Sequence, residues 1–179
     1  MLIQTFNQNG IVVDVADLAS LNKKSAIHVL HVDEDPSLQK ITKLMLLDLD
    51  SSLEIDNACC VDEAFKKLAA KDYAVVVSDY EMPQKDGLQF LKELREQNNE
   101  IPFILFTGKG REEVSIKALN LGADGYFHKQ GPPETVYGEL THGITLVNEK
   151  AKAKSALRRA KNDTTRLWIM EQKQFLFTI

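Results

Sequence analysis

The sequence predicts an α/β domain made of five consecutive βα units around a parallel sheet. From Ser25 onward, short runs of apolar and β-branched residues alternate with longer segments of helical periodicity, a pattern typical of strands joined by crossover helices. Two of these runs are almost continuously apolar, as central strands are when helices cover both faces of a sheet. A chain of 179 residues has room for one such domain and an appendage.

The expected strands are short and are separated by polar or helical segments. They lie at residues 27–32, 53–55, 74–78, 102–106 and 125–128, and the third and fourth are the two apolar runs. The helices expected after them cover about residues 36–49, 61–70, 87–97, 111–121 and 133 onward. In the first helix, Asp35 is a suitable N-cap and Pro36 a suitable first-turn residue. Its buried face is expected to comprise Leu38, Ile41, Met45 and Leu49.

The last expected helix is long. No Pro or Gly interrupts residues 144–179, so the helix is expected to run from about 133 to beyond 165 and to project from the domain. Ile144, Val147 and Ala151 fit a heptad, but the next position on that seam is Lys154, so a coiled coil is poorly supported. We divide the chain into an N-terminal extension (1–25), one domain (26–148) and a helical tail (149–179).

Composition and charge exclude several classes of protein. No apolar run reaches the roughly eighteen residues of a membrane span, and the first residues lack the pattern of a secretory signal, so a cytoplasmic protein is expected. The only cysteines, Cys59 and Cys60, are expected to be reduced and buried or half-buried. Residues 148–179 hold eight Lys/Arg and three Asp/Glu. Such a basic run is more often a solvated helix face than a nucleic-acid site, so nucleic-acid binding is not the expected role.

Charged and hydroxyl side chains follow the ends of four of the predicted strands. In an open parallel sheet, functional groups gather beyond the carboxyl ends of the strands. The residues at these positions are Asp33, Glu34 and Asp35 after the first strand, Asp79 after the third, Thr107 after the fourth and Lys129 after the fifth. The sequence therefore predicts that carboxylates, a hydroxyl and an ammonium group meet at one edge of the sheet.

This set of groups suits a particular chemistry. Crowded carboxylates repel one another unless a cation neutralises them, and hard oxygen ligands suit Mg²⁺ better than Zn²⁺. Beside a bound Mg²⁺, one carboxylate can attack a phosphoryl donor, while Lys129 neutralises phosphoryl oxygens and Thr107 offers a hydrogen bond. The predicted product is an aspartyl phosphate.

The chain resembles the receiver domains of response regulators in two-component signalling, over about residues 26–148. The resemblance is carried by the segments 32–36 (VDEDP), 78–83 (SDYEMP), 86–87 (DG), 107–108 (TG) and 122–129 (GADGYFHK). It implies a flavodoxin-like, doubly wound (βα)5 fold with strand order 2-1-3-4-5, followed here by the extended helix. It also implies a phosphoacceptor signalling domain with no enzymatic activity beyond its own phosphorylation and dephosphorylation.

The resemblance assigns a role to each residue of the site. Asp79 is the expected phosphoacceptor and a metal ligand. Asp33, Glu34 and the backbone carbonyl of Glu81 complete the expected Mg²⁺ site, in which Mn²⁺ could substitute. The groups expected to bind the phosphoryl group or to report the switch are Thr107, Lys129 and Tyr126.

The resemblance also implies partners. The expected phosphoryl source is a sensor histidine kinase or a phosphotransfer protein. The tail resembles a signalling helix that leads to a sensor or kinase module, and a homodimer through the tail or the fourth helix is an open alternative.

The sequence departs from the family at two places and carries a further charged pair beside the site. Receivers commonly follow the lysine with a cis proline, but Lys129 precedes Gln130, so we expect either a trans peptide with a rearranged loop or a strained exception. Glu34 replaces the usual Asp and is expected to bind metal at longer reach or through water. Glu81 and Lys109 flank the site, and we expect them to pair and hinder the attacking water.

Three alternatives belong to other functional classes. A degenerate receiver would act only as a protein-binding scaffold. A Mg²⁺-dependent phosphatase of the haloacid-dehalogenase-like type would need an Asp two residues after the nucleophile, where this chain has Glu81. A flavodoxin-like cofactor binder would need a Gly/Ser/Thr-rich loop after the first strand, which the sequence lacks.

Overall fold

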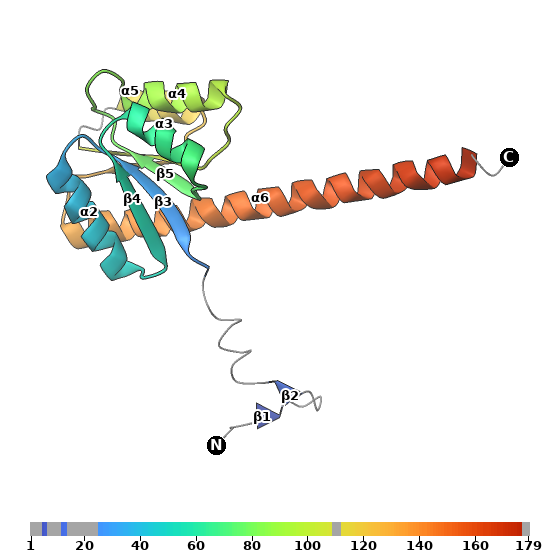
Figure 1. The fold of residues 1–179 in the computed structure, drawn as a ribbon. Coiled ribbons are helices and arrows are strands. Elements are labelled where there is room, and N and C mark those ends of the chain that lie inside the picture. Colours follow the sequence, from blue (N-terminus) through green and yellow to red (C-terminus); the bar gives the residue numbers. More distant parts are fainter. Residues whose placement is uncertain (1–4, 7–11, 14–24, 109–111, 177–179) are drawn as a thin grey trace.

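The computed structural model describes residues 5–6, 12–13, 25–108 and 112–176, with side chains for 25–108 and 112–162. Its centre is a five-stranded parallel sheet in the order β4-β3-β5-β6-β7 (Figure 1). The strands are β3 (Ile27–Val32), β4 (Leu53–Ala58), β5 (Val75–Ser78), β6 (Phe103–Thr107) and β7 (Gly125–His128). Counted from β3, this order is 2-1-3-4-5, which confirms the predicted doubly wound fold.

Helices cover both faces of the sheet. They are α2 (Pro36–Leu49), α3 (Val61–Ala70), α4 (Gly87–Glu96), α5 (Glu112–Asn120) and α6 (Pro133–Leu176). Helices α2 and α6 pack on one face, and α3, α4 and α5 pack on the other (Figure 1). The strands β5 and β6 are buried at every position, as their apolar sequences predict.

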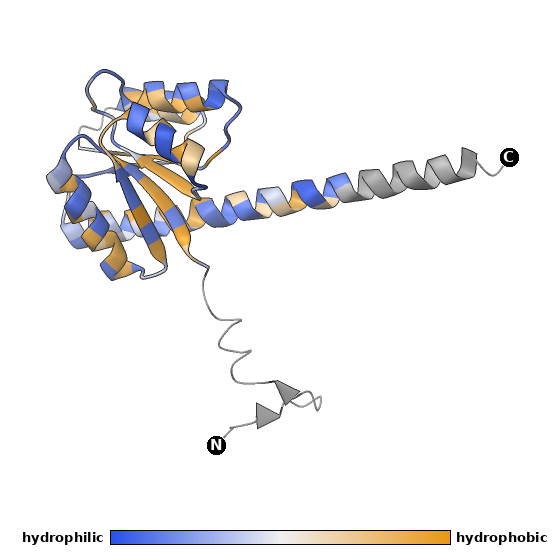
Figure 2. Cartoon of the chain, in the orientation of Figure 1, coloured by the Kyte–Doolittle hydropathy of each residue, from blue (hydrophilic) through white to orange (hydrophobic). Residues whose placement is uncertain are grey.

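The hydrophobic core is split by the sheet into two clusters. One lies under α2 and α6 and includes Val29, Val77 and Phe106; the other lies under α3, α4 and α5 and includes Leu30, Val76 and Leu105. Successive residues of one strand enter opposite clusters, because side chains alternate across a sheet. In Figure 2, β5 is coloured as hydrophobic, whereas the helices combine hydrophobic and hydrophilic stretches.

Strand β4 is three residues longer than the sequence predicted. It pairs with β3 along its whole length, from Ile27↔Leu53 to Val32↔Ala58. The additional part contains Asp56 and Asn57, which interrupt the apolar pattern that marked the strand. Asp56 accepts hydrogen bonds from Lys71 and Tyr73, both at 2.9 Å, so its polar side chain has partners at the sheet edge.

The predicted buried face of α2 is only partly confirmed, because Met45 packs against the core and Leu38 is half-buried but the other two predicted residues are exposed. The residues that are fully buried are Thr42 and Leu46, whereas Ile41 and Leu49 are each 47% exposed. Apolar residues occur on several sides of this helix, so their spacing does not single out one face. Packing against α6 decides the orientation, and the Thr42 hydroxyl lies 3.4 Å from that of Tyr137 in the buried contact. The predicted start is confirmed, because Asp35 caps the helix and Pro36 begins it.

Helix α6 is continuous for 44 residues, about 66 Å at 1.5 Å per residue. Its first part belongs to the core, and the rest extends past the edge of the sheet (Figure 1). Ile144 and Val147, which suggested a heptad seam, pack inside the domain. Beyond them, Lys152 donates to the Ser25 hydroxyl at 3.1 Å and Lys154 pairs with Glu100 at 3.0 Å.

The remaining sequence expectations concern the N-terminal extension and the cysteines. Of residues 1–24, the described parts are Thr5–Phe6 and Val12–Val13, which pair as antiparallel strands β1 and β2. No disulfide joins Cys59 and Cys60. Cys60 is half-buried as expected, but Cys59 is exposed, because it lies in the surface segment directly after β4.

Among the described residues, no helix combines the length and the hydrophobicity of a membrane span.

Close backbone approach explains Gly87 at the start of α4. A Cβ on this residue would collide with the backbone oxygen of Asp79 and come within 2.7 Å of Leu105 Cδ1. We therefore expect Gly87→Ala to lower the free energy of unfolding by about 1–3 kcal/mol through overpacking. Gly138→Ala in α6 is the matched control, because no atom lies within 4 Å of its Cβ position; it should raise stability by about 0.5–1 kcal/mol. Urea denaturation of both variants tests this, and an unchanged midpoint for Gly87→Ala would contradict it.

Candidate functional site

The backbone ladder of the sheet positions the acidic residues. The Asp33 N–H donates to the Ala58 carbonyl at 3.1 Å, and the Asp79 N–H donates to the Val32 carbonyl at 2.8 Å. These bonds continue the pairing of β3 with β4 and β5 by one residue. Both aspartates are therefore fixed at the carboxyl edge of the sheet, as predicted for an open parallel sheet.

The three carboxylates that were predicted from the sequence as metal ligands lie close together. Asp33, Glu34 and Asp79 each offer an oxygen, and these oxygens all lie within 4.8 Å of one another. Asp33 is fully buried and Asp79 is 8% exposed, whereas Glu34 lies at the surface. Two buried carboxylates so close together are costly unless a cation accompanies them.

Lys129 supplies that positive charge. Its Nζ lies 2.6 Å from Asp33 Oδ2 and 2.8 Å from Asp79 Oδ2. Burial by itself would lower the pKa of Lys129, but the hydrogen bonds to Asp33 and Asp79 outweigh it and raise the pKa above its ordinary value. The ammonium group therefore stays charged at neutral pH and bridges the two aspartates.

Backbone donors hold the other oxygen of each aspartate. Asp35 N–H donates to Asp33 Oδ1 at 2.9 Å, and Tyr80 N–H donates to Asp79 Oδ1 at 2.6 Å. Hydrogen bonds from backbone N–H groups to a carboxylate are short and strong. Asp33 and Asp79 are thus each held at both oxygens, which fixes their orientation.

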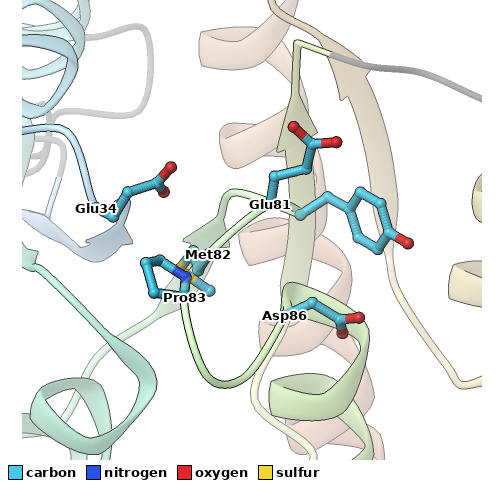
Figure 3. A pocket seen from close by; sticks show the side chains of 6 residues that line it. Glu34, Glu81, Met82, Pro83 and Asp86 are labelled. Carbon is cyan, nitrogen blue, oxygen red and sulfur yellow. The ribbon is translucent and has the colours of Figure 1, made fainter.

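Glu34 stands at the rim of a shallow pocket of about 410 Å³ beside this cluster (Figure 3). The pocket is lined by Glu34, Tyr80, Glu81, Met82, Pro83 and Asp86. Partial loss of hydration, together with the charges of Asp33 and Asp79, raises the pKa of Glu34. Figure 3 shows Glu34 and Glu81 on two sides of the pocket, with Met82 and Pro83 between them. Glu34 is exposed, so its carboxylate lies outside the buried pair.

Strands β6 and β7 bring the remaining predicted residues to the same edge. Thr107 ends β6 and is fully buried. The Lys129 N–H donates to its carbonyl at 2.8 Å, so the two residues are fixed side by side. Tyr126 lies within β7 and stacks edge-on against His128 at 5.1 Å. Burial raises the pKa of Tyr126, whose hydroxyl has no hydrogen-bond partner among the described residues.

The peptide bond between Lys129 and Gln130, where receivers commonly have a cis proline, is trans in this chain. No cis peptide bond occurs in the described part of the chain, so the Lys129–Gln130 bond is trans. Lys129 nevertheless reaches both aspartates. The predicted pairing of Glu81 with Lys109 stays a prediction, because Lys109 lies outside the described residues.

Two residues that border the site were not predicted from the sequence. Gln39 in α2 donates through Nε2 to the carbonyls of Asp33 at 2.6 Å and Ala58 at 3.2 Å, which clamps the ends of β3 and β4. His31 lies two residues before Asp33, so it shares a face of β3 with it, and is 1% exposed. A polar residue in a core strand near a cluster of acids was the available signal for His31; an isolated glutamine on a helix gave none.

The sequence model of the family described as the response regulator receiver domain matches residues 29–141. The C4-dicarboxylate transport transcriptional regulatory protein DctD of Pseudomonas aeruginosa is 32% identical over 125 residues, covering 66% of this chain and 25% of that protein. The chain spans less than half the length of this relative and of other curated relatives that it matches.

Solved structures agree with the sequence comparison. The receiver domain of the Francisella response regulator 1452 is 26% identical with a TM-score of 0.62, covering 70% of this chain and 98% of that one. The response regulator TrrA of Thermotoga maritima, solved in complex with Mg²⁺ and BeF, is 27% identical with a TM-score of 0.58, covering 68% and 98%.

Because His31 is buried, we expect the free energy of unfolding to depend on pH in the acidic range. Burial lowers its pKa to about 4 in the folded chain, against about 6.5 when unfolded. Protonation therefore favours the unfolded chain, so stability falls as the pH drops from about 6.5 to 4, by about 3 kcal/mol. His31→Leu should flatten this part of the pH profile. Urea denaturation in EDTA measures it, with His142→Gln on the exposed side of α6 as control. Equal profiles for the parent and His31→Leu would contradict the assignment.

Proposed function

The chain belongs to the response regulator receiver family, and we propose that it accepts a phosphoryl group on Asp79 from a phosphohistidine donor. The observation that carries this proposal is the environment of the Asp79 carboxylate. One oxygen is held by the Tyr80 N–H and the other by the Lys129 ammonium group, which also contacts Asp33. Asp79 is thus oriented and 8% exposed at the edge of the site.

The proposed reaction transfers the phosphoryl group between two side chains. An oxygen of Asp79 attacks the phosphorus of a phosphohistidine, the bond from phosphorus to the imidazole nitrogen breaks, and the histidine leaves. Lys129 moves its hydrogen bonds from the aspartates to a phosphoryl oxygen, which keeps the new negative charge paired. The Thr107 hydroxyl donates to another phosphoryl oxygen. Positioning and charge neutralisation are the main requirements of such a transfer.

We further propose that the acidic edge holds Mg²⁺, for which Mn²⁺ can substitute. The carboxylates of Asp33, Glu34 and Asp79 and the backbone carbonyl of Glu81 would hold the ion. Their oxygens are hard ligands, and the carboxylate oxygens lie close enough to share one cation. Bound there, the ion would neutralise the carboxylates and the phosphoryl oxygens. The similarity to TrrA, solved with Mg²⁺ and BeF, supports this assignment.

The proposed output is a change in the surface formed by α5, β7 and the first part of α6. Phosphorylation would draw Thr107 toward the phosphoryl group, and the Tyr126 side chain would turn inward. This rotation would break no hydrogen bond, because the Tyr126 hydroxyl makes none with the described residues. This is a population shift between two packings. A sensor histidine kinase or phosphotransfer protein is the proposed donor. Helix α6 would pass the change from the domain (26–148) to the tail (149–179) and to a sensor or kinase module.

Phosphorylation can be tested directly by intact mass after incubation with acetyl phosphate. The parent should gain one hydroxylamine-labile phosphoryl group with Mg²⁺ and none with EDTA, because Lys129 alone cannot neutralise three carboxylates and the incoming phosphoryl oxygens. Asp79→Asn should gain none, since it lacks the nucleophilic oxygen. Asp48→Asn, on the exposed side of α2, is the matched control and should behave like the parent. Absence of uptake by the parent with any phosphodonor would favour a protein-binding scaffold instead.

A further inference from the structure

We propose that Gln130 is a positioning residue that holds Lys129 and Thr107 at a fixed spacing for phosphoryl transfer. This inference rests on the proposed function, because it assigns Gln130 a role in that reaction. Gln130 follows Lys129 through a trans peptide bond.

The side chain of Gln130 connects the ends of two neighbouring strands. Its Nε2 donates to the Gly108 carbonyl at 2.7 Å. One residue earlier, the Lys129 N–H donates to the Thr107 carbonyl at 2.8 Å. The glutamine side chain therefore extends the pairing of β6 and β7 by one step beyond the last backbone bond.

The residues that precede the two ends of this link are the ones that would contact the phosphoryl group. Lys129 directly precedes Gln130, and its Nζ contacts Asp33 and Asp79. Thr107 directly precedes Gly108 and is fully buried. Fixing their relative positions before the reaction lowers the entropy that must be lost when both groups bind the phosphoryl oxygens.

A proline at position 130 would restrict the backbone through its ring but would offer no side-chain donor. Gln130 achieves restriction in another way, through a hydrogen bond between loops. Such a bond can open without any change in peptide isomer. The Gln130 side chain thus adds a second contact to the backbone bond that already joins Lys129 and Thr107, and a single side-chain substitution removes that second contact.

The position also allows a clean experiment. Gln130 is exposed, so truncating it leaves no cavity in the core. Among the described residues, its side chain bonds to the Gly108 carbonyl and to none of the proposed Mg²⁺ ligands. A loss of positioning should therefore lower the rate of phosphoryl uptake and leave the Mg²⁺ concentration for half-saturation unchanged.

The test compares Gln130→Ala and Gln130→Glu with the parent, using acetyl phosphate and a Mg²⁺ titration. Both variants lose the N–H donor, and the rate constant of uptake should fall about 3- to 10-fold, the effect of one hydrogen bond of ordinary strength. Gln97→Ala, an exposed glutamine at the end of α4, is the matched control and should retain the parental rate. Thermal unfolding of each variant separates positioning from a general loss of stability.

Hydrogen exchange of the Lys129 amide provides a second readout that needs no phosphorylation. This N–H is bonded to Thr107, and it should exchange about 3- to 10-fold faster in Gln130→Ala if the link holds the two strands together. A parent that takes up phosphate while Gln130→Ala reacts equally fast would overturn the inference alone. A parent that takes up none would overturn the proposed function, and the exchange rate would still decide whether Gln130 makes the link.

Discussion

The contact on which the rest of the site depends is the bridge from one ammonium group to two buried carboxylates. Lys129 meets Asp33 and Asp79 at 2.6 and 2.8 Å in a region where both acids are nearly inaccessible to water. Removing one partner of such a buried group leaves the others with uncompensated charge, which is far more costly than losing a surface ion pair. The bridge also sets the chemical state of the site. Any cation or phosphoryl group that enters must compete for the same oxygens or for the same ammonium group.

The sheet makes this arrangement possible because its backbone pairing continues beyond the strands. Asp33, Asp79 and Lys129 each donate a backbone hydrogen bond to the neighbouring strand end, to Ala58, Val32 and Thr107. Their side chains are therefore aimed by the same ladder that forms the fold. Close packing adds a further constraint, since α4 begins so near to Asp79 that Gly87 has no space for a side chain. The same backbone hydrogen bonds therefore hold the sheet together and position the site, and a change in strand register would displace the site residues.

Much of this organisation could be predicted from residue types and spacing. The apolar runs at 75–77 and 103–106 identified the central strands, and the acids, threonine and lysine after the strands identified the edge at which they meet. Features that depend on packing could not be predicted. The buried face of α2 was predicted only in part, because leucines lie on several sides of that helix. The predicted β4 was too short, because Asp56 and Asn57 find their hydrogen-bond partners only in the folded chain. Gln39 acts through two carbonyl groups that the fold brings together, a relation that no sequence spacing encodes.

Helix α6 belongs to the core at one end and extends well beyond the domain at the other, without interruption. Its rotational phase is therefore fixed where Leu140 and Ile144 are packed, and that phase is carried along the whole length. Inserting or deleting one residue in the extension would turn everything beyond it by about 100° and shift it by about 1.5 Å, whereas seven residues would nearly restore the original direction. The length of the extension, counted in helical turns, thus sets the direction in which anything attached to it faces.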